Sequence, residues 1–339
     1  METSLANDIK RGLLEKRENL DEWCESCSQD ELVTHLGQDA ESIVQTHLHV
    51  IDESLQKLEA GVLGVCEVCH EAVEQELLQM DYTTCVCLGH YTDAELRQLE
   101  SELELSQVIQ RGLLPQTLPT IEGLNIAAFS RPAQIVGGDY FDFVNFKDGA
   151  HGLVMADVSG HGVSAGMFMS SLQTAFQTLV PDTDSPPEVL ERINRLYIHN
   201  INFTTFVTVF FGKYEPRTGI LSYANAGHNS AYLYRMATNQ EIWLRPTGPA
   251  IGLMEGFVIR KEDIKLESGD ILLLYTDGIT EASNHQGALW GEDNLADIIR
   301  ANANSSAEQL IQKILKAMKD HTGENPLADD VTLVITKVA

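Results

Sequence analysis

The sequence has no long apolar run, and this absence excludes a membrane-spanning helix. No stretch approaches the ~18–20 consecutive apolar residues that cross a bilayer, and the charged N-terminus "METSLANDIKRGLLEKRENLDEW" lacks the apolar segment of a signal peptide. Basic residues are also scarce, with 23 Lys and Arg against 50 Asp and Glu and a formal net charge of −27. Because phosphate contacts need clustered Lys and Arg, nucleic acid is not an expected partner. We expect a soluble, cytoplasmic protein that binds neither nucleic acid nor membrane.

The acidic excess is concentrated in the first third of the chain. Residues 1–115 carry 7 Lys and Arg against 24 Asp and Glu, whereas the remainder carries 16 against 26. Such an excess commonly serves solubility, and the alternative is acid gathered for metal ions or for a basic protein partner.

Cysteine is absent after residue 90. All six cysteines lie before that point: Cys24, Cys27, Cys66, Cys69, Cys85 and Cys87. In a reducing cytoplasm, clustered cysteines indicate metal ligands or redox groups rather than disulfides. Cys24 and Cys27 lie in a helical context without a second pair in register, and we interpret them as two cysteines on a helix face.

The other cysteines predict a structural zinc site. The spacing Cys66-x2-Cys69-x17-Cys87-x2-His90 suits a closed tetrahedral site of three thiolates and one imidazole. A set with Cys85 in place of His90 would have a cramped second pair, and a thiol redox role is a further alternative. Residues 50–90 resemble the DksA/TraR-type zinc finger, with a histidine where that family usually has a cysteine. The resemblance implies one Zn²⁺; members of that family bind RNA polymerase through parts outside the finger.

The pattern of the chain predicts four segments. They are a helical region, the zinc finger, a connector helix and a larger domain, at residues 1–60, 61–91, 92–115 and 116–339. The connector begins with a capping box, Thr92 with Glu95, and stops at Pro115. Its leucines recur at alternating spacings of three and four, as in a short coiled coil, but polar residues interrupt the seam. A helix packed on its own domain is an equal alternative.

The larger domain alternates between strand-like and helical segments. Runs rich in β-branched and aromatic residues predict the strands: "LNIAAFS", "GLVMADV", "TTFVTVFFGKYE", "GILSYANAG", "SAYLYRM", "GDILLLYTDG" and "DDVTLVITKV". Helices are expected at about 163–180, 187–199, 291–301 and 305–319. Several strands are separated only by turn-length gaps, which favours antiparallel sheets over a doubly wound parallel sheet. The predicted class is α+β.

Aspartates stand at the ends of several apolar strands: Asp139, Asp157, Asp277, Asp329 and Asp330. A carboxylate at the end of a buried strand is costly unless its charge is met. Several of them on strands of one core suggest convergence on cations, and a set without Cys or His favours Mg²⁺ or Mn²⁺ over zinc. From the residues alone, a metal site and ordinary strand-end turns remain equally open.

In their order along the chain, six motifs resemble one phosphatase family. They are "GLLPQTLP", "VGGDYFDF", "ADVSGHGVSAG", "NAGHNSAYL", "GDILLLYTDGITEA" and "ADDVTLVI". Residues 110–339 resemble the SpoIIE/RsbU-type branch of the metal-dependent Ser/Thr protein phosphatases (PPM family). The resemblance implies an α/β/β/α sandwich, two antiparallel sheets flanked by helices, with two Mn²⁺ or Mg²⁺ ions at one edge.

The same resemblance implies a role for each matching residue. Asp157 would bridge the two ions, and the backbone carbonyl of Val158 would bind one of them. Asp277 and Asp329 would hold the other ion, although the neighbour of Asp329, also an aspartate, is a less favoured alternative. Asp139 would hold metal-bound water. Two such ions activate a water molecule and neutralise the phosphate oxygens.

The stretch "MADVSGHGVSAG" could also indicate a nucleophilic hydrolase, because it places Ser159 and His161 close to an aspartate. Neighbours in sequence rarely give a nucleophile and its base the necessary geometry. We therefore expect Ser159 and His161 to shape the turn, and leave His161 open as a general acid. His228, in "NAGHNS", is interpreted as a buried, hydrogen-bonded histidine.

The sequence thus predicts a metal-dependent protein Ser/Thr phosphatase regulated through an N-terminal zinc-binding module. The resemblance implies a phosphorylated regulatory protein as substrate, typically an anti-sigma-factor antagonist of the STAS type, and a homodimer formed through residues 92–115. Two alternatives remain: a catalytically silent scaffold that binds a phosphoprotein, and a transcription modulator that contacts RNA polymerase.

Overall fold

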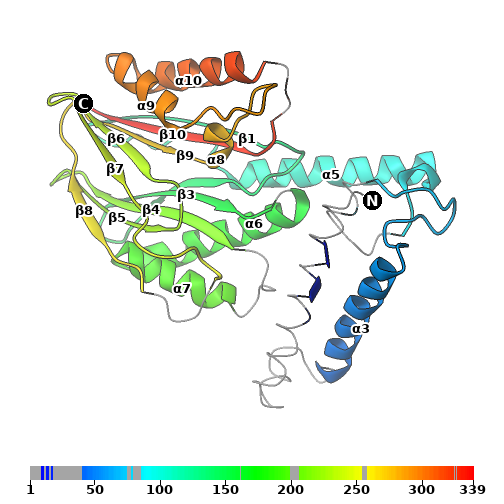
Figure 1. Ribbon diagram of the computed structural model, residues 1–339. Helices are drawn as coiled ribbons and strands as arrows, with labels where there is room; N and C mark the ends of the chain where they lie inside the picture. The colour runs from blue at the N-terminus through cyan, green and yellow to red at the C-terminus, as the bar shows by residue number, and fades with distance from the viewer. Residues whose placement is uncertain are drawn as a thin grey trace. The chain divides into compact units, whose positions relative to one another are not determined.

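The computed structural model of the chain (Figure 1) describes residues 9–10, 13–14, 17, 40–74, 78, 85–160, 162–198, 206–253, 258–323, 325 and 327–339. These residues fall into two compact units, one reaching to Ser101 and the other beginning at Glu102. Cys24, Cys27 and His161 lie outside the described ranges. None of the described helices combines the length and the apolar character needed to cross a bilayer.

The N-terminal unit contains helix α3 (Ala40–Glu59) and a short segment folded on itself. The helix ends just before Gly61, as predicted, and the φ of +70° at this glycine lies in the left-handed region that glycine favours. The following segment has a core of four buried side chains, Cys66, Val73, Leu78 and Cys87, and includes the 3-10 helix η1 (Leu88–His90). A core this small usually needs a disulfide or a metal to hold it.

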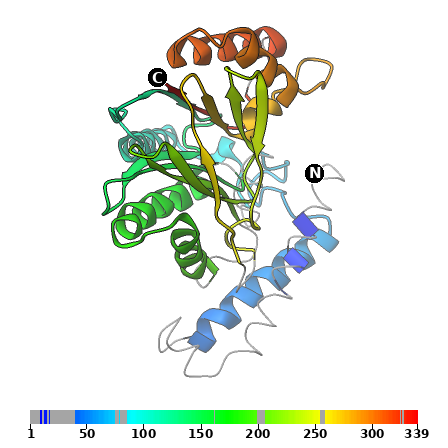
Figure 2. The same cartoon turned by 90° about the vertical axis from the view of Figure 1, so that its left-hand side faces the viewer.

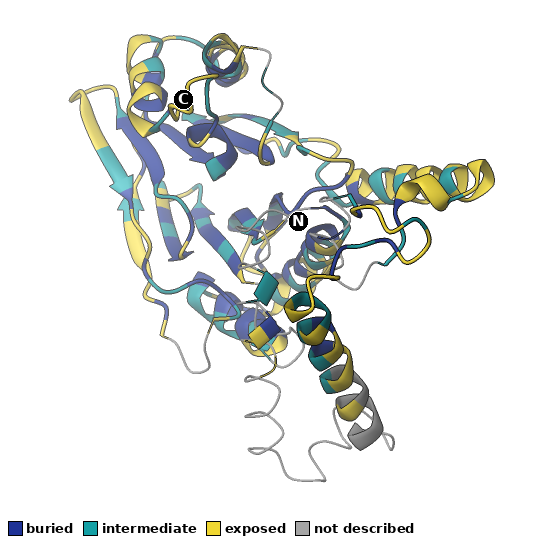
Figure 3. Cartoon of the chain, turned by 45° about the vertical axis from the view of Figure 1, so that its right-hand side comes forward, coloured by how far each residue is buried: buried dark blue, intermediate teal, exposed yellow. Residues whose placement is uncertain are grey.

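The connector helix α5 (Asp93–Leu113) starts with the predicted capping box. The backbone N–H of Glu95 donates to Thr92 Oγ1 at 3.3 Å, and the N–H of Thr92 donates to the Glu95 carboxylate at 2.8 Å. Most of the helix surface is exposed (Figure 3). Its most exposed large apolar side chains are Leu105, Val108 and Ile109. Such an apolar patch on a helix commonly marks an interaction surface.

The C-terminal unit is built from two five-stranded sheets in which all neighbouring strands are antiparallel. Sheet A has the strand order β1 (Leu124–Arg131), β10 (Val331–Val338), β9 (Ile271–Tyr275), β6 (Ala231–Arg235) and β7 (Gln240–Leu244). Sheet B has the order β2 (Tyr140–Asn145), β3 (His151–Val158), β4 (Val207–Glu215), β5 (Ile220–Ala226) and β8 (Glu262–Lys265). Because the chain passes repeatedly from one sheet to the other, the two sheets form one domain.

Two helices cover the outer face of each sheet (Figures 1 and 2). Sheet B carries α6 (Gly162–Leu179) and α7 (Pro186–Ile198), which the 3-10 helix η2 (Val180–Asp182) connects. Sheet A carries α9 (Glu292–Ala301) and α10 (Ala307–Thr322). Separate hydrophobic clusters fill the space under each helical layer and the space between the sheets. The predicted sandwich of two antiparallel sheets flanked by helices is confirmed.

Strand β3 shows why its sequence reads as an apolar run rather than as an alternating pattern. Val154 and Ala156 point into the cluster under the helices, whereas Leu153 and Met155 point into the cluster between the sheets. A strand that is covered on both faces buries every side chain along its length. The apolar run ends at Asp157, where the sandwich meets solvent.

Three strands were not predicted: β2, β7 and β8. β7 and β8 lie at the outer edges of their sheets, and most of their side chains are exposed or half-buried, so they lack the apolar signature of a core strand. β2 is also an edge strand, but it is mostly buried. Its sequence, within "VGGDYFDF", has aspartates between its aromatic residues and therefore lacks the apolar run of a core strand.

Candidate metal and catalytic sites

The aspartates predicted as metal ligands gather at one end of the sandwich, and sheet B contributes two of them. Asp157 lies near the end of β3, opposite Thr208 of β4. Asp139 directly precedes β2, and Tyr140 pairs with Ala156, so the next position on this ladder brings Asp139 beside Asp157. Because the carboxylates of Asp139 and Asp157 lie so close together, their negative charges repel each other unless a proton or a cation neutralises them.

Sheet A contributes the other aspartates. Asp277 is the first residue of the short helix α8 (Asp277–Thr280), directly after β9, and Asp329 lies just ahead of β10. Tyr275 pairs with Leu333, so the end of β9 and the start of β10 lie at the same edge of the sheet. In an antiparallel pair, the end of one strand lies beside the start of the other. Asp277 and Asp329 therefore lie close together although they are far apart in sequence.

Three of these carboxylates, those of Asp139, Asp157 and Asp277, have raised pKa values. Burial and the nearby negative charges, that of Asp277 first, raise the pKa of Asp157 to about 7. Burial and the charges of Asp329 and Glu281 raise the pKa of Asp277 to about 6. Burial and the charge of Asp157 raise the pKa of Asp139 well above its usual value. Among the described residues, no Lys or Arg is a main contributor to these three shifts, so the cluster lacks a compensating side-chain cation.

Glu281 belongs to this group of charges, although we did not expect it from the sequence. It follows Asp277 by four residues, about one helical turn, which places both side chains on the same side of the backbone. Its charge contributes to the raised pKa of both Asp157 and Asp277. The signal was present in "TDGITEA", where two acids recur at helical spacing.

Asp139 is held from the opposite sheet. Its carboxylate accepts a hydrogen bond of 2.8 Å from Thr276 Oγ1, and Thr276 directly follows β9. The hydroxyl oxygen of Thr276 in turn accepts the backbone N–H of Thr332 at 3.0 Å. Asp139 is only 6 % exposed. This buried link between the sheets was not predicted, because nothing in the sequence pairs Thr276 with an aspartate more than a hundred residues away.

The structure separates the roles of Asp329 and Asp330. The Asp330 carboxylate accepts the backbone N–H groups of Ala133 at 2.7 Å and of Gly138 at 2.6 Å, and it is 4 % exposed. A side chain at Gly137 would meet this carboxylate at 2.2 Å, which explains the glycine there. Asp330 therefore organises the loop that leads to β2, whereas Asp329 is exposed.

The chemistry of this end of the sandwich fits divalent cations. Buried or half-buried carboxylates that raise one another's pKa are costly unless positive charge meets them, and hard oxygen ligands suit Mg²⁺ or Mn²⁺. A side chain at Gly138 would approach the carbonyl oxygen of Val158 to 2.8 Å, so glycine leaves space beside that oxygen. Among the described residues, no three of these carboxylates have oxygens that all lie within 4.8 Å of one another. A set shared between two ions does not have to converge on one point.

Ser159 serves the turn rather than catalysis. Its Oγ accepts the backbone N–H of Phe206 at 2.9 Å, and its own N–H donates to the carbonyl of Phe206 at 2.9 Å. Gly160 follows with a φ of +95°, which other residues rarely adopt. With its hydroxyl committed to a backbone group, Ser159 fits the turn-forming role that we expected.

His228 is a buried, hydrogen-bonded histidine, as expected. It is 2 % exposed, and its Nδ1 lies 2.8 Å from Thr208 Oγ1. Burial lowers the pKa of His228 to about 4, so the ring is neutral at physiological pH.

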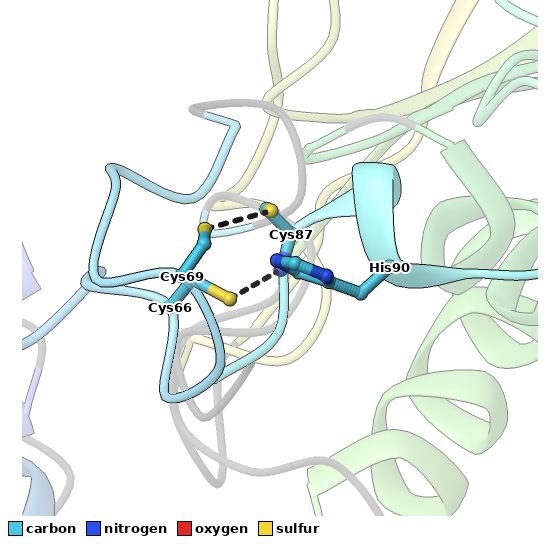
Figure 4. A group of neighbouring side chains, drawn as sticks. All are labelled: Cys66, Cys69, Cys87 and His90. Atoms are coloured by element: carbon cyan, nitrogen blue, oxygen red, sulfur yellow. Dashed lines mark hydrogen bonds between the residues drawn. The ribbon is translucent and has the colours of Figure 1, made fainter.

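In the N-terminal unit, the predicted zinc ligands come together (Figure 4). The candidate ligand atoms of Cys66, Cys69, Cys87 and His90 all lie within 4.8 Å of one another, and no other group of three or more does so within the described residues. Cys66 Sγ accepts the backbone N–H groups of Val68 and of Cys87, both at 3.4 Å. The group contains His90 and not the nearby Cys85, so the geometry supports the first of the two ligand sets considered.

The family model for stage II sporulation protein E (SpoIIE) matches residues 147–339. The phosphoserine phosphatase RsbU of Bacillus subtilis (strain 168) is 31 % identical over 241 residues, which are 71 % of each chain.

Solved structures show the same fold. The SiaA-PP2C domain of Pseudomonas aeruginosa superposes with a TM-score of 0.66 at 21 % identity, over 73 % of this chain and 100 % of that one. The RsbU and RsbW domains of Rv1364c from Mycobacterium tuberculosis give a TM-score of 0.56 at 29 % identity, over 67 % of this chain and 63 % of that one. The residues that the family model matches include Asp157, Asp277 and Asp329, and the match begins after Asp139. The chain therefore belongs to the SpoIIE family of protein serine/threonine phosphatases.

Proposed function

We propose that the chain hydrolyses phosphoserine or phosphothreonine on a regulatory protein, with two Mn²⁺ or Mg²⁺ ions held at the end of the sandwich. The observation that carries this proposal is the carboxylate cluster, whose members come from both sheets and for which the described part of the chain supplies no compensating cation. The relative named phosphoserine phosphatase supports the same chemistry. In a partner-switching circuit the substrate would be a phosphorylated anti-sigma-factor antagonist of the STAS type.

Each aspartate has a distinct part in this proposal. Asp157 would bridge the ions, Asp277 and Asp329 would bind on the side of sheet A, and the carbonyl of Val158 would complete the set on sheet B. Such ions supply charge neutralisation for the phosphate and acidify water. Asp139, held by Thr276 at 2.8 Å, would accept a hydrogen bond from the attacking water.

Asp330 would act indirectly, through the loop it holds. Its oxygens already accept backbone N–H groups, whereas Asp329 is exposed and accepts the N–H of Asp330 at 2.8 Å. This difference favours Asp329 as the ligand of the pair.

A catalytically silent scaffold would have no need for the full set of carboxylates. An activity assay distinguishes the phosphatase from such a scaffold.

We further propose that Cys66, Cys69, Cys87 and His90 bind one structural Zn²⁺ in a DksA/TraR-like finger. Support comes from the close approach of the four ligand atoms and from the N–H groups that point at Cys66 Sγ, as is common around zinc-bound thiolates. The surrounding core contains little besides these thiols. Zinc would therefore stabilise this fold directly.

The connector helix offers a route for regulation. The side chain of Gln110 is buried and holds the backbone of Gly137 at two points: its Nε2 donates to the carbonyl at 2.6 Å, and its Oε1 accepts the N–H at 3.0 Å. One turn earlier, Gln107 donates to the carbonyl of Ile135 at 2.9 Å. Gly137 adjoins Gly138, whose N–H binds Asp330. A shift of α5 would therefore move the loop that leads to Asp139.

The exposed apolar residues of α5 also support a homodimer. Leu105, Val108 and Ile109 are 57–66 % exposed and recur at helical spacing on one face. A second copy of the helix would cover this face in a coiled coil. Dimerisation at residues 92–115 would then affect the position of α5, the helix that carries Gln110.

Replacement of Asp157 by asparagine tests the catalytic site. We expect Mn²⁺-dependent hydrolysis of para-nitrophenyl phosphate and of a phosphoserine peptide to fall by about 10²-fold or more, because one ligand charge is lost. The matched control is Asp142→Asn, since Asp142 is also a buried carboxylate but bonds Tyr140 and Gln177 instead. A wild-type protein without activity would favour the scaffold, and an active Asp157→Asn would remove Asp157 from the mechanism.

The raised pKa values predict how the metal-free protein responds to pH. A carboxyl whose pKa rises from 3.8 in the unfolded chain to about 7 at Asp157, or about 6 at Asp277, binds a proton more tightly in the folded state. Stability is therefore lost as the pH rises from about 4 to about 7. With EDTA present, the melting temperature of the wild-type protein should fall as the pH rises from about 4 to about 7. The fall should be less steep in Asp157→Asn, which lacks one of the titrating carboxyl groups.

Mn²⁺ should restore more stability at neutral pH than at acidic pH, because the ions replace the protons. Calorimetry with and without Mn²⁺ measures both effects. A metal-free melting temperature that rises between pH 5 and pH 7, with no difference between the wild type and Asp157→Asn, would contradict the electrostatic account.

Zinc content tests the finger. The purified chain should contain about one zinc ion per molecule, and Cys66→Ser should lose it, as measured by inductively coupled plasma mass spectrometry. Cys85→Ser is the control, because Cys85 lies outside the ligand group and its replacement should leave the zinc in place. If Cys85→Ser lost zinc as readily as Cys66→Ser, the ligand set would be wrong.

Gln110 tests the route from the N-terminal module. We expect deletion of residues 1–90 to change the phosphatase activity of the wild type, and to have a much smaller effect when Gln110→Leu removes both hydrogen bonds to Gly137. Gln116→Leu is the control, since Gln116 bonds only to carbonyls of residues 111 and 114. An equal effect of the deletion with and without Gln110→Leu would exclude this route.

A further inference from the structure

The loop between β5 and β6 carries a buried histidine that the proposed chemistry does not use. β5 ends at Ala226 in sheet B and β6 begins at Ala231 in sheet A, so the chain changes sheets here. Ala226 pairs with Val209, near the start of β4. This start of β4 lies beside the end of β3 that carries Asp157. His228 therefore crosses between the sheets at the end where the aspartates gather.

The ring of His228 contacts one element of each sheet. In sheet B, its Nδ1 lies 2.8 Å from the hydroxyl of Thr208, the residue that pairs with Asp157 across the β3–β4 ladder. In sheet A, Tyr232 of β6 pairs with Leu273 of β9, so the segment that leads from His228 into β6 lies beside Tyr275, the last residue of β9. The backbone of Tyr275 also raises the pKa of the ring. Asp277 follows Tyr275 by two residues. One neutral ring therefore lies between the strand neighbour of Asp157 and the strand that ends before Asp277.

The protonation of the ring follows from its surroundings. Burial lowers the pKa of His228, and the backbone of Tyr275 acts in the opposite direction, as a carbonyl oxygen facing the ring does. A neutral imidazole has one donor and one acceptor. We assign the Thr208 hydroxyl as the donor to Nδ1, which leaves the proton on Nε2. Nε2 has no hydrogen-bond partner among the described residues, although the backbone of Tyr275 contributes to the pKa of the ring.

The backbone of His228 is also fixed in place. Its N–H donates to Asn225 Oδ1 at 2.8 Å, and Asn225 Nδ2 donates to the carbonyl of Asn229 at 3.3 Å. The hydroxyl of Thr247 accepts the N–H of Asn225 at 2.9 Å. The loop therefore holds the imidazole as a rigid spacer, because both its main chain and its ring are tied to neighbouring strands.

We propose that His228 is a positioning residue that sets the separation between Asp157 on sheet B and Asp277 on sheet A, and thereby the affinity of the site for divalent cations. This inference rests on the metal-binding function proposed above. The spacer would act together with the Thr276–Asp139 hydrogen bond to resist the mutual repulsion of the carboxylates before the ions bind. With the spacer, the ligands stand near their binding positions before the ions arrive, and less free energy is spent on bringing them together.

The test compares Mn²⁺ binding to the full-length chain, by isothermal titration calorimetry, in variants that break the contact from either side. His228→Phe keeps a planar ring of similar size without nitrogens, and Thr208→Val removes the hydroxyl with little change of shape. Each should weaken Mn²⁺ binding by about 10-fold, as loss of groups that orient metal ligands does. Thr208→Ser, which retains the hydroxyl, should bind Mn²⁺ like the wild type. The double variant should lose no more than either single variant.

The control is Tyr232→Phe, because the hydroxyl of Tyr232 is also buried and finds no hydrogen-bond partner in the described part of the chain. Tyr232 lies instead in the cluster under α9 and α10. Its melting temperature should change without any change in Mn²⁺ affinity. If His228→Phe and Thr208→Val behave like this control, with wild-type affinity, His228 is only structural and the inference is overturned. If the wild type itself binds no Mn²⁺, the proposed metal site fails first, and the inference fails with it.

Discussion

Repulsion among carboxylates at the end of the sandwich is the constraint on which the catalytic unit depends. Asp139 and Asp157 come from sheet B, whereas Asp277 and Asp329 come from sheet A. Burial and nearby negative charge raise the pKa values of Asp139, Asp157 and Asp277, because the folded chain concentrates negative charge where solvent cannot fully screen it. Divalent cations bound by carboxylates of both sheets would neutralise this repulsion and connect the two sheets. The same charge that destabilises the metal-free protein would then bind the ions and, through them, the phosphate.

Neutral hydrogen bonds hold the carboxylates in place around this charge. Thr276 binds Asp139 across the sheets, backbone N–H groups bind Asp330, and His228 lies between Thr208 and Tyr275. None of these contacts adds a compensating charge, so they fix geometry and leave the charge for the ions. Gln110 joins the connector helix to the same loop through Gly137. A signal that moves α5 would thus reach the loop before Asp139 through the contacts of the Gln110 side chain with the backbone of Gly137.

The sequence predicted those features whose cause is local. Apolar runs that end in aspartate marked the strand ends at Asp157 and Asp277, and antiparallel sheets followed from short gaps between strands. Residues alone left a metal site and ordinary turns equally open, and it was the order of the motifs that favoured the phosphatase family. Edge strands β7 and β8 were missed because they bury little. The contacts of Thr276 and Asp330 could not be predicted, because they join segments of the chain whose proximity exists only in the folded protein.

The most direct test of the central claim is the position of metal ions in crystals grown with Mn²⁺. Anomalous scattering at the manganese edge locates the ions independently of activity. The account predicts two manganese peaks about 3.5–4 Å apart, both within coordination distance of Asp157, with Asp277 and Asp329 beside one of them. Manganese density absent from this end of the sandwich, or ions bound without Asp157, would contradict it.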